Sequence, residues 1–347
     1  MHFLLTWEPD RRFYFQLIYS IMKKSLLLLL VLTALTACHS QAPQYSNPVI
    51  NENAPDPTVI RGDDGAFYLF ATQRQGNIPI YRSDNLVDWE FAGFAFDPEN
   101  RPRLVEGAGY WAPDIQKVGD RYILYFSNGV WDGHWESGIA CAESESITGP
   151  YRYAHILIPS PESGVRNSID QNFFSDGGKN YMAWGSFFGI YLVELSEDGR
   201  SVGQPFDRKV QIAGDAYEGS YIHKRDGKYY LFASIGTCCE GLKSRYTLVV
   251  GRSDSIEGPY TDRHGNPMLA NFHEILVSGD NFVRGPGHCS EIITDDAGQD
   301  WILYHGYDAD DPDAGRKAWL DKVDWVDGWP VMAGSVPRGG DAPYFKR

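Results

Sequence analysis

The sequence predicts an all-β fold, a five-bladed β-propeller with four-stranded blades around a central channel. Three observations support this prediction. Short strand-type segments alternate with Gly- and Asp-rich turns from residue 51 onward. The same order of segments recurs five times at roughly 50-residue spacing, which is typical of propellers. Aromatic residues, which favour strands, make up 14% of the chain.

Each repeat has a first strand, a turn, two further strands and a closing turn that leads into an outer strand. In the fourth repeat, residues 221–225 and 228–234 flank Asp226-Gly227, a pair that is typical of a β-hairpin turn. The five repeats are assigned to residues 54–90, 111–153, 168–199, 215–260 and 288–331. A flat sandwich can use similar strands, but it does not repeat one order of segments five times.

The first 50 residues are predicted to precede the propeller, which is assigned to residues 51–347. The N-terminal region resembles a bacterial lipoprotein signal peptide. It contains the charged Met22-Lys23-Lys24, the apolar segment 25–35 and a Leu-Thr-Ala-Cys sequence that ends at Cys38, the expected lipidated first residue of the exported chain. The apolar segment is too short to cross a bilayer as a permanent helix. Residues 1–21 are then an upstream extension, with Met22 as the expected start, and residues 39–50 a polar tether. The alternative is a cytosolic protein with a chance apolar segment.

Four further cysteines are Cys141, Cys238, Cys239 and Cys289. An exported chain can hold disulfides, and four cysteines allow three pairings. The adjacent Cys238 and Cys239 are not expected to bridge each other, because disulfide geometry favours a larger separation. We therefore expect free or singly paired structural cysteines, and none of them has the spacing of a zinc site.

The formal net charge of −15 at pH 7 argues against nucleic acid and polyanionic substrates as partners. A neutral ligand fits this charge better, and we expect a monomer. The 10 Trp and 21 Tyr residues exceed what a core needs. Most of this surplus is typical of β-sheet packing, and the rest indicates surfaces on which sugar rings can stack.

The first strand of each blade lines the channel of a propeller, so the heads of these strands converge. The predicted heads carry five ionisable side chains, which are Asp56, Asp114, Asp170, Glu218 and His288. Such a constellation indicates a functional site, because unpaired buried charge is costly. For Asp114, however, we favour a structural role in which its carboxylate accepts hydrogen bonds from backbone amides.

The chain resembles glycoside hydrolase family 43 and, within it, the endo-1,5-α-L-arabinanases. The segments that carry the resemblance are 54–57, 111–114, 167–170, 184–186, 218–220 with the 238–239 loop, 250–253, 285–288 and 300–301. The resemblance spans about residues 48–337 and implies an inverting hydrolase that cleaves α-1,5-L-arabinofuranosidic bonds in arabinan. The alternatives are an exo-acting α-L-arabinofuranosidase or a β-xylosidase of the same family, and a non-catalytic glycan-binding lipoprotein.

The resemblance implies that Asp56 is the general base, Glu218 the general acid, and Asp170 the residue that orients Glu218 and modulates its pKa. Inversion at an acetal needs an acid for the leaving oxygen and a base for the attacking water, with the two carboxyls about 6.5–9.5 Å apart. A third carboxylate close to the acid raises its pKa by like-charge repulsion and keeps it protonated near neutral pH.

By the same resemblance, His288 would coordinate a calcium or sodium ion at the channel centre through water, whereas the alternative is a histidine that hydrogen-bonds in the channel and contacts sugar. Arg316 either neutralises the carboxylate cluster or is a surface arginine. The candidate substrate-binding residues are Trp111, Asn167, Ser168, Ile169, Gly185, Ser186 and Phe187. Residues 128–137, with Trp131 and Trp135, are able to wall off one end of the cleft, so endo or exo action stays open.

Overall fold

The computed structural model describes residues 19, 22–23, 43–333 and 340–346. The chain divides into two compact units, Met1–Pro43 and Gln44–Arg347. Cys38 and most of the predicted signal peptide lie outside the described residues, so the lipidated cysteine stays a prediction. Among the described residues, no helix has the length and apolar character needed to cross a membrane.

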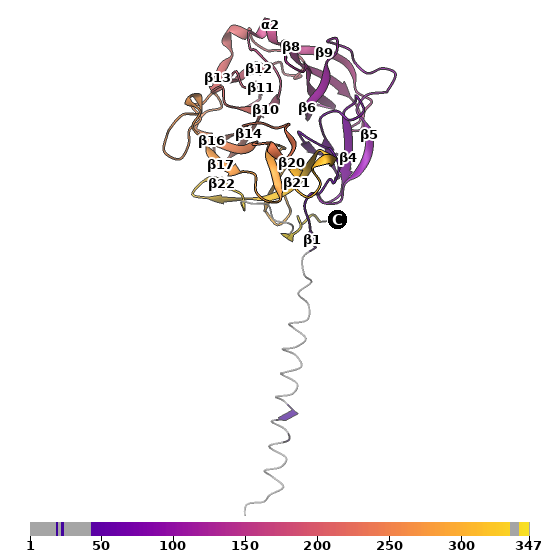
Figure 1. Cartoon of the computed structure of the whole chain (residues 1–347), viewed down its shortest axis with the longest axis vertical. Helices are drawn as coiled ribbons and strands as arrows, with labels where there is room; N and C mark the ends of the chain where they lie inside the picture. The colour runs from indigo at the N-terminus through magenta and orange to yellow at the C-terminus, as the bar shows by residue number, and fades with distance from the viewer. Residues whose placement is uncertain (1–18, 20–21, 24–42, 334–339, 347) are drawn as a thin grey trace, which may run out of the picture. The chain divides into compact units, whose positions relative to one another are not determined.

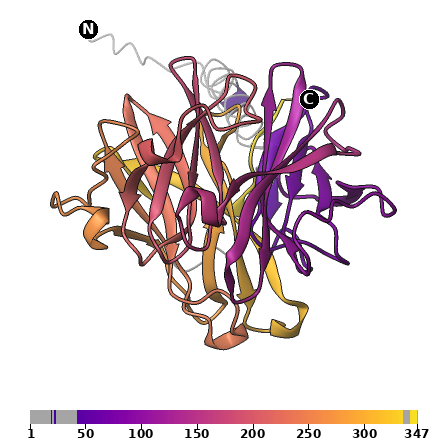
Figure 2. The same cartoon turned by 90° about the horizontal axis from the view of Figure 1, so that it is seen from above.

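The second unit contains five antiparallel sheets arranged as the blades of a propeller, together with a two-stranded sheet, and this confirms the predicted fold class (Figure 1). In Figure 1, strands β10 to β13 follow one another from the centre to the rim. The loops gather at two opposite faces of the propeller (Figure 2). Each first strand therefore lies beside the channel, and the loops that follow it open onto one face or the other.

The first blade contains β2 (Thr58–Arg61), β3 (Phe67–Phe70), β4 (Pro79–Ser83) and β5 (Glu90–Phe94), and the second contains β6 (Gly109–Val118), β7 (Arg121–Val130), β8 (Gly133–Ser144) and β9 (Arg152–Pro159). The third contains β10 (Asn172–Asp176), β11 (Lys179–Trp184), β12 (Ile190–Leu195) and β13 (Val210–Ala213), and the fourth contains β14 (Glu218–Arg225), β15 (Lys228–Ile235), β16 (Thr247–Ser253) and β17 (Glu274–Val277). The fifth contains β18 (Val283–Cys289), β19 (Ile293–Thr294), β20 (Asp300–Asp308), β21 (Arg316–Val326) and β22 (Trp329–Val331). The short helical elements are α2 (Ser160–Ser163), η1 (Phe206–Arg208), η2 (Gly241–Lys243), η3 (Met268–Ala270) and η4 (Pro312–Ala314).

The predicted hairpin of the fourth blade is confirmed, because Arg225 pairs with Lys228 across the Asp226-Gly227 turn. The outer strand of this blade, however, begins at Glu274 and not near residue 260. The Asp262 carboxylate accepts hydrogen bonds from the backbone N–H groups of His264 and Asn266 at 2.9 and 2.8 Å. These bonds fold the segment after residue 260 into a turn and delay the outer strand.

The N-terminal boundary of the propeller lies before residue 51, because residues 44–50 are part of it. Strand β1 (Gln44–Tyr45) pairs with β23 (Gly340–Asp341), and the side chains of Tyr45 and Ile50 are buried. The Asn47 amide donates to the Leu320 carbonyl at 2.7 Å. These residues cover the apolar space between the fifth and first blades, so the predicted tether 39–50 extends too far toward the propeller.

Five apolar clusters fill the spaces between neighbouring sheets, and each draws its members from two adjacent blades. Phe70 and Phe126 belong to one cluster, between the first and second blades. Trp184 packs with Tyr125 in the next. Burial of these large side chains drives sheet-on-sheet packing, and the aromatic content of the sequence serves mainly this purpose.

A ring of hydrogen bonds near the channel joins every blade to the next. In each case, a side chain of one first strand or its continuation accepts a bond from a backbone N–H of the following blade. The five acceptor–donor pairs are Thr58–Ile115, Asp114–Phe173, Asn172–Ile222, Tyr221–Ile292 and Glu291–Val59. The last pair closes the circle between the fifth blade and the first.

Removing one acceptor from this ring should destabilise the whole propeller. In Asn172→Ala, the buried N–H of Ile222 loses the Oδ1 atom that lies 2.9 Å away. We expect the free energy of unfolding in urea to fall by about 1–3 kcal/mol, the cost of an unsatisfied buried donor. Asn100→Ala, at an exposed loop position, is the matched control and should change it little. An unchanged stability of Asn172→Ala would show that the ring contributes nothing measurable.

Candidate active site

Five equivalent residues bend the chain into the channel, one at or near the head of each blade. They share a positive φ and are Asp56 (56°), Ala112 (42°), Asp170 (59°), Gly219 (59°) and His288 (46°). Four of them are not glycine, so this left-handed backbone conformation is energetically unfavourable by itself.

A side chain of the preceding blade accepts a hydrogen bond from the backbone N–H of each bent residue. In the same order, the acceptors are His305 Nδ1, Thr72 Oγ1, Ser127 Oγ, Asp170 Oδ2 and Ser234 Oγ. These bonds hold the bends in place and bring the side chains of Asp56, Asp170 and His288 together. Glu218 joins them from the position before Gly219.

Asp114 does not join this group. It lies inside β6, two residues beyond the bend at Ala112, where its carboxylate accepts a hydrogen bond from the Phe173 N–H. Burial, followed by the nearby Glu291 carboxylate, raises the pKa of Asp114. The bond from Phe173 confirms the structural role that the sequence favoured for Asp114, whose carboxylate joins the second blade to the third and does not take part in the convergence of the other heads.

Asp56 lies among polar side chains of the first and fifth blades. Its Oδ2 accepts a hydrogen bond from Thr72 Oγ1 at 2.6 Å, and its Oδ1 lies 3.1 Å from an Arg316 guanidinium nitrogen and 2.9 Å from His305 Nδ1. Burial alone would raise the pKa of this carboxyl. The positive charge of Arg316, the strongest of the opposing neighbours, outweighs burial, so the pKa is held well below its usual range. Asp56 is therefore ionised throughout the neutral range.

The two histidines beside Asp56 are neutral near pH 7. Burial, followed by the Arg316 charge, lowers the pKa of His305 to about 4, and burial also lowers the pKa of His288. His288 Nδ1 lies 3.5 Å from Asp56 Oδ1 and 4.0 Å from Asp170 Oδ2. Since neither imidazole is charged, we attribute the low pKa of Asp56 mainly to Arg316.

Glu218 is in the opposite electrostatic situation. Burial raises its pKa to about 7, and the Asp56 charge acts in the same direction. The Ser186 hydroxyl, which donates to Glu218 Oε2 at 2.7 Å, opposes this rise only in part. Burial and the neighbouring Glu218 raise the pKa of Asp170 as well. One channel thus contains an ionised carboxylate and a carboxyl pair that keeps a proton near neutral pH.

Thr72, Tyr246 and His305 are parts of this site that the sequence reasoning missed. The Tyr246 ring stacks on His305 with 5.5 Å between ring centroids and 9° between planes. A signal for two of them was present in the repeats, because a polar residue recurs near the end of each second strand, namely Thr72, Ser127, Ser186, Ser234 and His305. These strand ends face the heads of the next blade, which is why a small hydroxyl or imidazole recurs there.

Two of the predicted substrate-binding residues lie beneath the surface of the channel. Ser168 is 0% exposed and its hydroxyl accepts a hydrogen bond from the Trp184 indole at 3.1 Å. Ser186 is 1% exposed and holds Glu218. Both side chains are engaged in internal bonds, so we reassign them from direct substrate contact to support of the site. Gly185 is likewise buried and has a φ of 132°. A side chain at this position would clash with the Gly189 carbonyl.

The remaining predicted binding residues lie at the mouth of the channel. Trp111 lies over the backbone of Gly129, where a Cβ would come within 2.6 Å of the indole. The tip of the β7–β8 hairpin approaches Asn167, whose N–H donates to the His134 carbonyl at 2.8 Å. The hairpin carries the exposed Trp131 and Trp135, and Phe187 is exposed as well. Ile169 is half-buried beside them.

Cys238 and Cys239 form a disulfide with each other, so the expectation that adjacent cysteines stay unpaired is wrong. The bridge lies in the loop between β15 and β16. Cys141 and Cys289 are free and buried. Burial raises the pKa of the Cys141 thiol to about 12, which makes it unreactive.

The described residues do not form a protein-ligated calcium cage, because they contain no group of three or more His, Cys, Asp or Glu side chains arranged for a metal ion. His288 offers one neutral imidazole, whereas calcium prefers six to eight oxygen ligands. An ion at this place is compatible with the residues only if water supplies most of its ligands.

Comparison with known proteins places this geometry in context. The chain matches the glycosyl hydrolases family 43 over residues 45–330. The extracellular endo-α-(1→5)-L-arabinanase 1 of Bacillus subtilis (strain 168) is 32% identical over 296 residues, 81% of this chain and 88% of the relative. The extracellular exo-α-(1→5)-L-arabinofuranosidase ArbA of Cellvibrio japonicus (strain Ueda107) is 32% identical over 302 residues, 80% and 85% of the two chains. The solved GH43 endo-arabinanase from Bacillus licheniformis superimposes with a TM-score of 0.72 at 29% identity, over 83% of this chain and 99% of that one.

Removal of the Ser186 hydroxyl should raise the pKa of Glu218 above its value of about 7. The hydroxyl donates to the carboxylate and so favours the ionised form, and a hydrogen bond to a charged group is worth about 1.5–3 kcal/mol. In Ser186→Ala, the titration midpoint of Glu218 should therefore move upward by about 1 pH unit, measured by carbon NMR of carboxyl-labelled protein. Ser201→Ala, at an exposed position, should leave it unchanged, and a downward movement in Ser186→Ala would contradict the assigned bond.

Proposed function

The chain belongs to glycosyl hydrolases family 43, and we propose that it hydrolyses the α-1,5-L-arabinofuranosidic bonds of arabinan with inversion, predominantly by endo action. The observation that carries the proposal is the opposite displacement of two buried carboxyl pKa values in one channel, low for Asp56 and high for Glu218. The relatives named as arabinanases supply the substrate class. Exo action is the alternative, because one relative is named an exo-acting arabinofuranosidase.

In the proposed reaction Asp56 is the general base. Because Arg316 keeps it ionised, it is able to take a proton from water while the oxygen of that water attacks the anomeric carbon. Thr72 and Arg316 hold the carboxylate by both oxygens, so its orientation does not depend on the substrate. Electrostatic preorganisation of this kind avoids reorganisation during the reaction.

Glu218 is the proposed general acid. As the bond from the anomeric carbon to the leaving oxygen breaks, the Glu218 proton passes to that oxygen, and the products are two shorter chains. Asp170 is the proposed positioning residue, because its Oδ2 accepts the Gly219 N–H at 3.0 Å and so fixes the backbone next to the acid. Its proximity also raises the cost of ionising Glu218.

We further propose that the protein is exported, acts as a monomer without a nucleic-acid partner, and carries a lipid on Cys38. Relatives that are named extracellular support export. The lipid anchor rests on the residues around Cys38 alone.

A channel ion, calcium or sodium, is proposed to be held by His288 together with water. If calcium binds there, calcium at 100 times its Kd should raise the free energy of unfolding by about 2.7 kcal/mol, measured by thermal melts with and without a chelator. His288→Ala should abolish this increase. Equal melts with and without calcium in the unaltered protein would leave His288 as a hydrogen-bonding residue of the channel.

The two catalytic roles can be separated by the leaving group. Glu218→Ala should lose about 10²–10⁴-fold in kcat/KM on arabinan, but far less on an aryl arabinofuranoside whose phenolate leaves without protonation. Asp56→Ala should lose a similar factor on both substrates, because water activation is needed in each case. Glu162→Ala, an exposed carboxyl, is the control. If Asp56→Ala were rescued by the aryl substrate and Glu218→Ala were not, the assignments would be reversed.

Product analysis on linear α-1,5-arabinan tests the function itself. Endo action should release a spread of oligosaccharides that shortens with time, because bonds within the chain are cut. Arabinose or one fixed short product from the first time point would indicate exo action. If arabinan, xylan and aryl glycosides all stayed intact, the protein would be a glycan-binding member of the family.

A further inference from the structure

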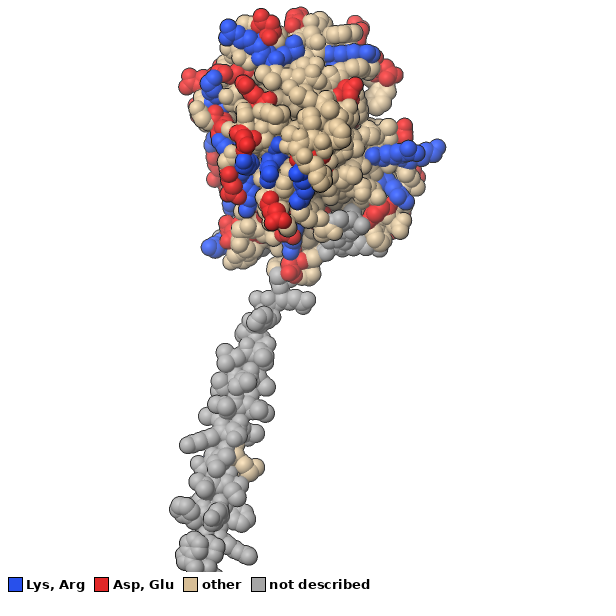
Figure 3. Space-filling view, turned by 90° about the vertical axis from the view of Figure 1, so that its left-hand side faces the viewer, with Lys and Arg blue, Asp and Glu red and all other residues tan. Residues whose placement is uncertain are grey.

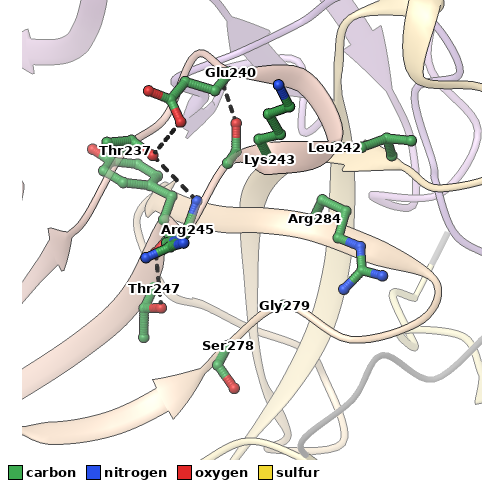
Figure 4. A pocket seen from close by; sticks show the side chains of 11 residues that line it. Thr237, Glu240, Leu242, Lys243, Arg245, Thr247, Ser278, Gly279 and Arg284 are labelled. Carbon is green, nitrogen blue, oxygen red and sulfur yellow. Dashed lines mark hydrogen bonds between the residues drawn. The ribbon is translucent and has the colours of Figure 1, made fainter.

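A second pocket opens on the propeller face that carries Glu218. Glu218 pairs with Ser234 near the end of β15, and the β15–β16 loop that follows forms one wall of this pocket. The loop between β17 and β18 forms the other. The volume is about 710 Å³, within the range of pockets that hold small ligands. The lining residues relevant to binding are Thr237, Lys243, Arg245, Ser278 and Arg284, most of which are labelled in Figure 4.

This pocket is cationic although the chain is strongly acidic. Lys243, Arg245 and Arg284 line it, against a single carboxylate, that of Glu240. Within residues 43–333, none of these three cations forms an ion pair, whereas many other Lys and Arg residues, such as Arg74, do. Elsewhere on the surface, Lys and Arg alternate with Asp and Glu, as Figure 3 shows for one face. The three cations are therefore available to a ligand.

The wall of the pocket is held by its own hydrogen bonds. The Arg245 N–H donates to the Thr237 carbonyl at 3.0 Å, and the Glu240 N–H donates to Ser244 Oγ at 2.8 Å. Gly285 lies so close to the loop that a Cβ there would approach the Ser244 Cβ to 2.6 Å. The Cys238–Cys239 disulfide belongs to the same loop. A wall that is ordered before binding reduces the entropic cost of binding a ligand.

The pocket and the catalytic channel share Tyr246. This residue lines the pocket, and its ring stacks on His305 beside Asp56. Its hydroxyl lies 3.3 Å from where a Cβ on Gly219 would be, next to Glu218. Tyr246 is 1% exposed and so forms a wall common to both, and a saccharide bound near Glu218 would reach the pocket over the face of the propeller.

We propose that this pocket binds the carboxylate of a uronic-acid residue carried by the saccharide that enters the channel. A guanidinium group matches a planar carboxylate, and Arg245 and Arg284 each supply one. The Ser278 hydroxyl matches a sugar hydroxyl, whereas the Thr237 hydroxyl already donates to the Glu240 carboxylate at 3.3 Å. The net charge of −15 disfavours a dense polyanion, so the ligand is a largely neutral chain with isolated carboxylates. The placement of this subsite rests on the proposed glycoside hydrolase function.

The test measures binding of digalacturonate and of its neutral methyl ester to the full-length protein by calorimetry. Digalacturonate should bind more tightly than its ester, and the affinity should fall as salt is added. In Arg245→Gln/Arg284→Gln, the Kd for digalacturonate should rise at least about 10-fold, because charge-assisted hydrogen bonds are lost. Arg103→Gln/Arg208→Gln removes the same charge from exposed positions outside the pocket and should leave the Kd unchanged.

Several outcomes would overturn the inference: no binding of digalacturonate, equal binding of its ester, or an equal Kd in the two double variants. Inorganic phosphate that binds as tightly as digalacturonate would show a general anion site and not a sugar site. The single variant Arg245→Gln, at an exposed position, should show a smaller increase in Kd without risk to folding. Cleavage of linear arabinan by the same preparation separates the two proposals, since arabinan cleavage without digalacturonate binding refutes this inference alone.

Discussion

The structure depends on hydrogen bonds that run from backbone N–H groups of one blade to side chains of the blade before it. One ring joins all five blades and closes through Glu291 and Val59. A second set fixes the five bent residues, from Asp56 to His288. Apolar packing between sheets provides the driving force for folding, but it does not specify where a backbone bends. The directional bonds do so, and they determine which side chains face the channel.

This arrangement places carboxyl groups with different charge states next to one another. Burial acts on every carboxyl of the channel in the same direction and favours the neutral form. Only Asp56 lies against a guanidinium, that of Arg316, so it alone ionises with ease among the three channel carboxyls. Glu218 receives hydrogen bonds but no cation. One arginine is thus enough to separate an ionised carboxyl group from protonated ones in a site that would otherwise hold equivalent groups.

The acidic character of the chain and its cationic pocket are consistent with each other. An overall charge of −15 repels dense polyanions at long range, where screening by salt is incomplete. The three unpaired cations beside Tyr246 act only at short range. A short acidic saccharide or a neutral chain with an occasional carboxylate satisfies both conditions, whereas a long chain with a carboxylate on every residue does not.

The sequence by itself determined the propeller, the order of its blades, and the strand heads on which Asp56, Asp170 and Glu218 lie, because these follow from local turns and a repeating hydrophobic pattern. Only the tertiary structure decided what surrounds them. Asp56 meets His305 across 249 residues, and Ser186 supports Glu218 from beneath the channel surface; no local pattern encodes such distances. The same holds for residues 44–50, which pack against the last blade. Local patterns specify elements, whereas contacts between neighbouring blades, whose residues lie far apart in the sequence, specify chemistry.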